Sequence, residues 1–208
     1  SDVCSSDLCS NIWVLRSEKS CATHGTVYPA ARKAEVMAAG QFEPLCPRSG
    51  GALVVEATQE ATPFGPSSFY GLTKQVQEQM VLMFASALGI DGFALRYQNV
   101  YGPGQSLTNP YTGILAVFSN LVRQGKPLNI FEDGLESRDF VFVDDVVDAT
   151  AACMAPSVHG VMALNVGSGV RTSVREVAQA IEMHESTVSR VTTAKFVLDR
   201  KSTRLNSS

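Results

Sequence analysis

Residues 69–97, FYGLTKQVQEQMVLMFASALGIDGFALRY, decide the fold class. Within them, apolar side chains recur at helical spacing, at Val76, Met80, Val81, Phe84 and Leu88. This periodicity predicts a long buried helix over residues 70–88, which Gly89 ends. A run of β-forming residues follows Gly92, over residues 93–97. The stretch therefore predicts a helix that leads into a strand.

The same alternation continues toward the C-terminus, after a turn at residues 101–104. The pattern predicts a helix over 111–123, strands over 128–131 and 140–143 around a turn at 132–134, a helix from an N-cap at Asp144 to Met154, a strand over 161–166 and a helix over 174–181. Asp144 and Asp145 could also be read as a metal pair, but N-capping is the interpretation we favour. Strands that alternate with helices predict an α/β fold with a parallel sheet.

Composition excludes several classes of protein. The chain is 45% hydrophobic and 18% charged with a net charge of −3, which is typical of a globular protein and unlike a basic nucleic-acid binder. Its longest apolar stretch, residues 80–90, is too short to span a bilayer. We expect no secretory signal, and five cysteines without a tight framework fit a reducing compartment. We therefore expect a cytoplasmic protein with no nucleic-acid or membrane partner.

The first signal of chemistry is the pair Tyr70 and Lys74 at the start of the predicted helix. A spacing of four positions places both side chains on one helical face. A nearby ammonium stabilises a phenolate, which favours general base catalysis by the tyrosine. On its own the pair is a weak signal, because such neighbours are common on helix surfaces.

The context of this pair strengthens it. The segments FYGLTKQVQEQM (69–80), ALRYQNVYGPGQS (94–106) and SRDFVFVDDVVDAT (137–150) resemble the extended short-chain dehydrogenase/reductases that act on nucleotide sugars. The stretch over residues 98–145 looks closest to the dTDP-L-rhamnose 4-epimerase group. The resemblance covers about residues 20–198 in consistent order.

This resemblance implies a partial Rossmann-like, doubly wound parallel sheet with its first βαβ units missing, beside a smaller substrate-binding lobe. It assigns residues 9–104 to a partial NAD-binding and catalytic domain with a Cys/His-containing insertion at 20–68, which we expect to be loop-rich. It assigns 105–139 to the substrate lobe, 140–169 to a return to the Rossmann-like domain, and 170–198 to a truncated C-terminal part of the substrate lobe. Residues 1–8 and 199–208 resemble translated sequencing-adapter sequence, and we expect neither end to be native.

The resemblance also implies roles for single residues. Tyr70 would be the catalytic base, and Lys74 would hold the nicotinamide ribose of NAD. Tyr97 and Val100 would also lie against NAD. The nucleotide-diphosphate sugar would contact Asn99, Gln105, Ser106, Asn109 and Arg138. Arg138 would neutralise the diphosphate, with an ion pair to Glu136 or Asp139 as the alternative.

The third member of the family's catalytic triad is a Ser or Thr. Its nearest match is Ser10, although the tyrosine expected four residues later is Val14. A surface serine without a catalytic role remains an open alternative. We further expect the parent enzyme to be a homodimer.

The insertion carries a possible metal site. Cys21-Ala22-Thr23-His24 and Cys46-Pro47-Arg48-Ser49 have zinc-ribbon spacing. Related epimerases resemble this pattern but end in Cys-Pro-x-Cys, whereas the fourth position here is Ser49, a poor zinc ligand. We therefore expect Cys21, His24 and Cys46 to bind zinc weakly or not at all, and a degenerate knuckle whose cysteines only pack remains open.

The predicted reaction is NAD-dependent epimerisation at C4 of a nucleotide-diphosphate sugar through a 4-keto intermediate. No glycine fingerprint for the dinucleotide pyrophosphate occurs in the 208 residues, so we expect this chain alone to be inactive. Two alternatives stay open. One is a nucleotide-sugar 4,6-dehydratase or another sugar-nucleotide dehydrogenase, and the other is a non-catalytic remnant or zinc-knuckle binding module.

Overall fold

The structure, a computed structural model, describes residues 15–30, 32–107, 113–130 and 132–182. Two compact units divide the chain. The first comprises the residues up to Arg96 together with Ala155–Asn165, and the second comprises Tyr97–Met154 and the residues from Val166 onward. The assignment of cofactor and substrate lobes along the chain stays a prediction.

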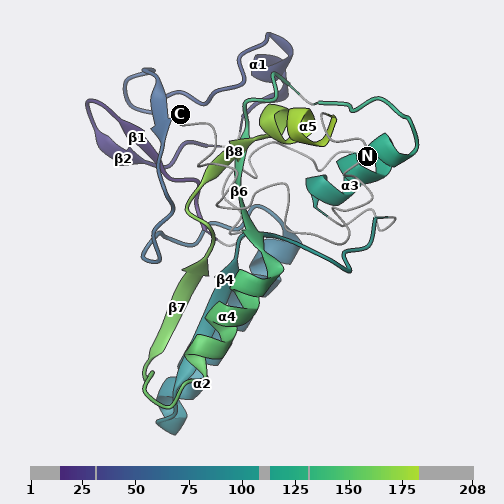
Figure 1. The fold of residues 1–208 in the computed structure, drawn as a ribbon. Helices are drawn as coiled ribbons and strands as arrows, with labels where there is room; N and C mark the ends of the chain where they lie inside the picture. The colour runs from purple at the N-terminus through teal and green to yellow at the C-terminus, as the bar shows by residue number, and fades with distance from the viewer. Residues whose placement is uncertain (1–14, 31, 108–112, 131, 183–208) are drawn as a thin grey trace, which may run out of the picture. The chain divides into compact units, whose positions relative to one another are not determined.

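The first unit contains most of the strands of the N-terminal half (Figure 1). Its elements are β1 (Lys19–Cys21), β2 (Gly25–Val27), α1 (Ala34–Ala38), β3 (Leu53–Val55), α2 (Phe69–Leu88), β4 (Gly92–Tyr97) and β7 (Val161–Val166), the last two ending at the boundary with the second unit. The second unit contains β5 (Asn99–Tyr101), α3 (Ile114–Arg123), β6 (Ser137–Phe142), α4 (Val143–Cys153), β8 (Arg171–Ser173) and α5 (Val174–Glu182).

The insertion at residues 20–68 is more ordered than the sequence indicates. Strands β2, β1 and β3 form a small antiparallel sheet in that order, in which Ser20 lies opposite both Thr26 and Val54. Each strand has only three residues. Such short strands show no period-2 alternation, which is why the sequence predicts only loops here.

Helix α2 confirms the helix predicted from residue 70 to 88. The Ser68 side chain accepts a hydrogen bond from the Gly71 N–H and caps the N-terminus, and Gly89 ends the helix in the left-handed conformation, with φ of 64°. The prediction that its apolar residues are buried is wrong for this chain. The residues that set the periodicity are all exposed by 44% or more: Val76, Met80, Val81, Phe84 and Leu88.

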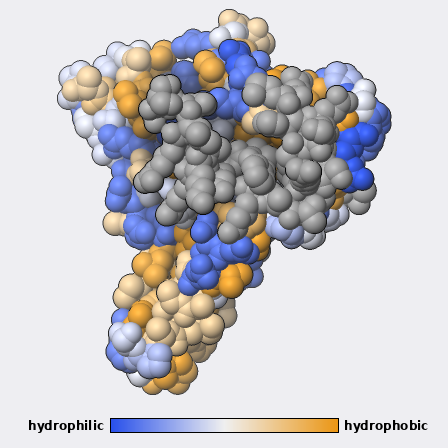
Figure 2. Space-filling view, viewed as in Figure 1, coloured by the Kyte–Doolittle hydropathy of each residue, from blue (hydrophilic) through white to orange (hydrophobic). Residues whose placement is uncertain are grey.

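The buried residues of α2 are instead Gly71, Glu78 and Ala85, which recur every seventh position along one narrow face. A helix that is apolar on several faces is typical of an element covered from more than one side. In the described residues only the narrow face is covered, so apolar surface remains on the others. Hydrophobic surface is visible in Figure 2 where Figure 1 draws the lower end of α2.

Strands β4 and β7 pair in parallel, in agreement with the predicted parallel sheet. The Gly92 N–H donates to the Gly160 carbonyl, and the Gln98 N–H donates to the Val166 carbonyl. Because both hydrogen bonds advance together along the two strands, the strands run in the same direction. Gly92 also allows close packing by α2, since a Cβ at this position would lie 2.4 Å from the Ala85 Cβ.

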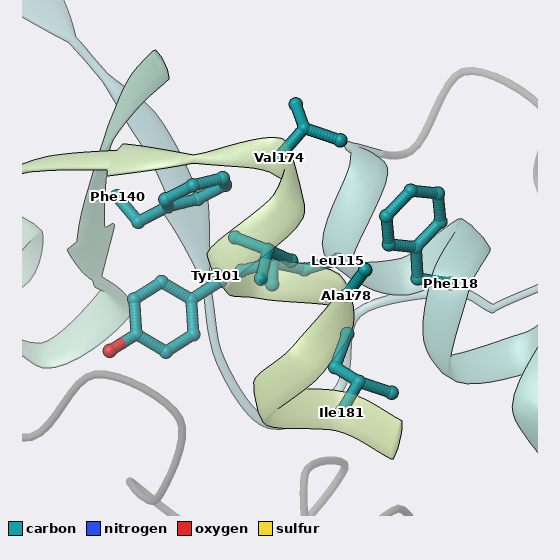
Figure 3. Packing of buried hydrophobic residues seen from close by; sticks show 8 residues of the cluster. Tyr101, Leu115, Phe118, Phe140, Val174, Ala178 and Ile181 are labelled. Carbon is teal, nitrogen blue, oxygen red and sulfur yellow. The ribbon is translucent and has the colours of Figure 1, made fainter. Parts of the chain in front are cut away.

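The second unit is built on a three-stranded sheet in the order β5-β6-β8. β5 and β6 are parallel, with Asn99 opposite Phe140, and β6 and β8 are antiparallel, with Arg138 opposite Thr172. Helices α3 and α5 pack against this sheet and form the main hydrophobic core (Figure 3), which comprises Tyr101, Leu115, Phe118, Phe140, Val174, Val177, Ala178 and Ile181. The predicted α/β class with parallel strands is thus confirmed.

Two local predictions in this unit are wrong. Residues 128–130 form no strand and instead follow Pro127 as a loop, from which Leu128 packs against the core; residue 131 lies outside the described range. Asp144 is not the N-cap of α4, because the helix begins at Val143 and Phe142 occupies the cap position. Asp144 and Asp145 instead lie in the first turn, where their negative charges interact favourably with the positive end of the helix dipole.

None of the described helices is both long and apolar enough to cross a lipid bilayer.

Candidate functional site

Tyr70 and Lys74 lie on the first turns of α2, as predicted. The Lys74 ammonium is 5.6 Å from the centre of the Tyr70 ring, so the two side chains share one helical face. Tyr70 is 54% exposed, and Lys74 is also exposed and donates a hydrogen bond of 3.1 Å to Gln77 Oε1. A phenol and an ammonium in this arrangement present one group that can accept a proton and one fixed positive charge beside it.

The next position on that face anchors the helix. Glu78, four residues after Lys74, is buried and receives two hydrogen bonds from Arg96 of β4, at 2.8 Å from Nε and 2.6 Å from Nη2. Arg96 also donates to the Glu60 carbonyl and lies over the Phe64 ring. The bidentate pair fixes the rotation of α2 about its axis, and so fixes the face that carries Tyr70 and Lys74. The sequence prediction did not include this pair; its only signal was an arginine in an otherwise apolar strand.

Three residues predicted to contact NAD or the substrate, Tyr97, Asn99 and Val100, lie in or beside β5. The Asn99 side chain donates to the Asp139 carbonyl at 3.0 Å and so ties β5 to β6. The Tyr97 hydroxyl lies 3.1 Å from the Thr150 hydroxyl of α4. Val100 follows Asn99 in β5 and is half-buried. Each of the two polar side chains therefore has a structural partner, and contacts with NAD or substrate stay predictions.

Arg138 lies on β6 and forms an ion pair with Glu136 at 3.6 Å, with both side chains 12% exposed. The ion pair considered as the alternative to diphosphate binding is thus present. Asp139, the other candidate partner, accepts hydrogen bonds from the Ser168 hydroxyl and from the N–H groups of Ser168 and Gly169. A role for Arg138 with a diphosphate stays a prediction.

Gln105 lines a small pocket in the second unit, together with Tyr101, Gly102, Leu107, Leu115, Ala116 and Ser119. Ser119 is fully buried, and its hydroxyl has no hydrogen-bond partner within the described residues. Ser106 is exposed and is not among the lining residues. Asn109 and Ser10 lie outside the described residues, so their predicted roles stay predictions.

Tyr70 and Lys74 belong to the first unit, whereas Asn99 and Arg138 belong to the second. The prediction that all four face one cleft therefore stays a prediction.

The structure brings together the three predicted metal ligands. The His24 Nδ1 atom lies 3.5 Å from the Cys21 sulfur and 3.6 Å from the Cys46 sulfur, and all three ligand atoms lie within 4.8 Å of one another. Cys21 and Cys46 are buried, whereas Ser49, whose hydroxyl is 3.8 Å from the Cys21 sulfur, is exposed. The predicted convergence of these residues is confirmed.

The hydrogen bonds of this cluster favour charged forms. The Ser49 hydroxyl, together with the N–H groups of Ser49 and Arg48, lowers the pKa of Cys46 to about 6, against burial, which raises it. The Thr23 N–H and the His24 side chain lower the pKa of Cys21. Hydrogen bonds to Cys21 and Cys46 raise the pKa of His24. These contacts lower the pKa of both thiols and raise the pKa of the histidine, so they favour thiolates next to an imidazolium.

The sequence profile of the NAD dependent epimerase/dehydratase family matches residues 48–167, more than half of the chain. A dTDP-L-rhamnose 4-epimerase from Burkholderia thailandensis is 40% identical over 158 residues, which cover 76% of this chain and 42% of that protein. A UDP-glucose 4-epimerase from Mycolicibacterium smegmatis is 40% identical over 124 residues, covering 60% of this chain and 39% of that protein.

Solved structures show the same likeness. A UDP-glucose 4-epimerase from Thermotoga maritima with UDP-glucose has a TM-score of 0.56 at 32% identity and covers 64% of this chain and 42% of its own. The Thermus thermophilus UDP-glucose 4-epimerase complex with NAD has a TM-score of 0.55 at 30% identity, covering 68% of this chain and 44% of its own. The chain thus spans about two-fifths of the length of these relatives, and its fold is part of their Rossmann-like fold.

A second profile, the Sigma-54 DNA binding domain, matches residues 168–203. In the described part of that stretch, helix α5 buries Val174, Val177, Ala178 and Ile181 in the core of the second unit (Figure 3). This segment completes the α/β core, and the match carries no inference about DNA. The parallel strands, the Tyr70–Lys74 helix and the matched profile agree, and the chain belongs to the NAD dependent epimerase/dehydratase family.

Proposed function

We propose that this chain is the catalytic and sugar-binding part of an enzyme that epimerises a nucleotide-diphosphate sugar at C4. The observation that carries the proposal is the position of the Lys74 ammonium, 5.6 Å from the centre of the Tyr70 ring, with both side chains exposed. In a chain of this family, such a pair supplies a general base and the charge that stabilises it.

The Tyr70 phenol and the Lys74 ammonium can both bind the ribose of a nicotinamide nucleotide. Ribose hydroxyls both donate and accept hydrogen bonds, so a phenol and an ammonium can hold them together. Tyr70 and Lys74 would therefore bind the nicotinamide ribose of NAD. When bound, NAD supplies the hydride acceptor and donor that epimerisation at a carbinol carbon requires.

The chain's own residues would handle the proton and the substrate. Tyr70 as phenolate accepts the proton of the C4 hydroxyl while the C4 hydrogen departs as hydride, which leaves a 4-keto sugar. When the hydride returns to the opposite face of C4, Tyr70 gives the proton back to the oxygen. Lys74 places a positive charge near the Tyr70 ring while the proton moves. Neither proton nor hydride is consumed overall, so the reaction is an isomerisation.

The substrate class follows from the relatives and from the polar groups of the second unit. Arg138 offers a guanidinium for a diphosphate, and Gln105 offers an amide in a small pocket. Because Arg138 already pairs with Glu136, diphosphate binding would require it to exchange or share that partner. Since a dTDP-L-rhamnose 4-epimerase is 40% identical over 158 residues, dTDP-L-rhamnose is the first substrate to test, followed by UDP-sugars.

The test uses a protein that also contains the pyrophosphate-binding glycine loop, because no such fingerprint occurs in the 208 residues. An upstream βαβ unit from a close relative, joined to this chain, should bind NAD and convert dTDP-L-rhamnose or a UDP-sugar to its C4 epimer. Product analysis separates the alternatives, since a dehydratase releases a 4-keto-6-deoxy sugar. A protein that binds NAD and yields neither product would support a non-catalytic remnant.

A further inference from the structure

We propose that Cys21, His24 and Cys46 form a zinc site with three protein ligands, whose fourth coordination position opens to solvent beside Ser49. This site is separate from the Tyr70–Lys74 pair and from the proposed epimerisation. Cys21 is 4% exposed and Cys46 is 3% exposed, whereas Ser49 lies at the surface.

The two sulfur–nitrogen distances of the cluster fit a single tetrahedral zinc ion. Zinc–sulfur bonds of about 2.3 Å and zinc–nitrogen bonds of about 2.0 Å at a tetrahedral angle place sulfur and nitrogen about 3.5 Å apart. The two sulfur–nitrogen distances are 3.5 Å for Cys21 and 3.6 Å for Cys46, both to His24 Nδ1. Cysteines that only pack in an apolar core do not require an imidazole nitrogen at this distance from both sulfurs.

The backbone around the cluster forms two tight turns that present the ligands. The His24 N–H donates to the Cys21 carbonyl in the turn between β1 and β2. The Gly50 N–H donates to the Cys46 carbonyl, and the Cys46 N–H donates to the Gly51 carbonyl, in the second turn. A metal bound here would link the β1–β2 hairpin to the turn over residues 46–51. Because that link joins segments far apart in sequence, it would stabilise the small sheet.

Ser49 determines how tightly the metal is held. Its hydroxyl is 3.8 Å from the Cys21 sulfur and accepts a hydrogen bond from the Gly51 N–H at 3.3 Å, so it lies beside the remaining coordination position. A neutral hydroxyl is a poor zinc ligand, and a water molecule would complete the tetrahedron. The site would therefore bind zinc weakly and exchange it readily. A cysteine at position 49 would place a third thiolate at this position.

The experiment is a Co²⁺ titration of the reduced 208-residue chain, followed by displacement with Zn²⁺. Tetrahedral thiolate–cobalt absorption with the intensity of two thiolates is expected, and zinc should abolish it. In Ser49→Cys the thiolate charge-transfer intensity should rise to that of three thiolates. The zinc affinity of Ser49→Cys should rise by on the order of 100-fold. Removing a hydrogen-bond partner of a metal ligand already lowers metal affinity by up to about 100-fold, and a new thiolate ligand should have at least as large an effect. Cys46→Ala should lose the signal, and Cys153→Ala, outside the cluster, should keep it.

A second readout requires no variant. Zinc should slow alkylation of Cys21 and Cys46, and should leave that of Cys153 unchanged, as measured by mass spectrometry. The proposal is wrong if the unmodified chain binds no cobalt, or if Cys46→Ala binds it as well as the unmodified chain. Stoichiometric zinc that survives mild chelation in the unmodified chain would contradict the open fourth position.

Discussion

The Glu78–Arg96 pair is a buried contact that holds α2 against β4. Both side chains are less than 10% exposed, and removing one partner of a buried ion pair costs about 3–5 kcal/mol because the other charge stays buried. Glu78→Leu should therefore lower the free energy of unfolding by about 3 kcal/mol in urea titrations. The double variant Glu78→Leu/Arg96→Met should recover most of this loss. Equal stability of Glu78→Leu and the unmodified chain would show that the pair does not anchor α2.

A second pair, His159 and Asp91, predicts a pH dependence. The two side chains lie 2.9 Å apart at the surface. The hydrogen bond from His159, with that from the Gly160 N–H, holds the pKa of Asp91 below its ordinary value of 3.8, and the hydrogen bond to Asp91 raises the pKa of His159 above 6.5. The histidine contribution to stability is complete below 6.5 and disappears as pH rises through the higher folded-state pKa. The aspartate contribution is present above 3.8 and disappears as pH falls through the lower one.

Asp91→Asn should accordingly lower the pKa of His159, as measured by imidazole proton NMR. His24 serves as a reference in the same spectra, because its raised pKa depends on Cys21 and Cys46 rather than on Asp91. An unchanged His159 titration in Asp91→Asn would show that the pair does not form in solution.

At the level of elements, the start of α2 depends on one serine. The Ser68 hydroxyl accepts a hydrogen bond of 3.0 Å from the Gly71 N–H. Replacing such an N-cap residue by alanine lowers the free energy of unfolding by about 1 kcal/mol. Ser68→Ala should lower the free energy of unfolding by this amount, and Ser68→Asn should not. The adjacent exposed Ser67→Ala is the matched control. Because Tyr70 lies in the capped turn, fraying there would also move the proposed base.

The elements that the sequence predicts correctly are those with strong local signals. Gly89 and the helical period identify α2, and the β-forming residues after Gly92 identify β4, because these signals act within a few residues. The burial of α2 could not be predicted, since it depends on which other elements cover the faces that carry Met80 and Phe84. The three-residue strands of the insertion are held by pairing between distant segments, which local periodicity does not report.

For the whole molecule, the candidate site also contains contacts that local sequence predicts and contacts that depend on distant segments. The pair Tyr70 and Lys74 is four residues apart on one helix, so helical geometry alone brings the side chains together. The convergence of Cys21 and His24 with Cys46 follows from motif spacing, whereas Glu78–Arg96 joins a helix and a strand through a contact without a motif. The ion pair of Arg138 with Glu136 could be considered from the sequence but not decided, because its geometry depends on β6.

The most direct test of C4 epimerisation by this chain is the turnover of dTDP-L-rhamnose and UDP-sugars by the protein extended with an upstream βαβ unit. NAD binding, measured by calorimetry, should appear in the extended protein and be absent at micromolar concentrations in the 208-residue chain. Tyr70→Phe should lower turnover by about 10²–10⁴-fold, the usual contribution of a general base. Tyr28→Phe, remote from the pair in sequence, should leave it unchanged. Turnover by Tyr70→Phe equal to that of the unmodified extended protein would contradict this assignment. Micromolar NAD binding by the 208-residue chain alone would contradict the expectation that NAD binding requires the added βαβ unit.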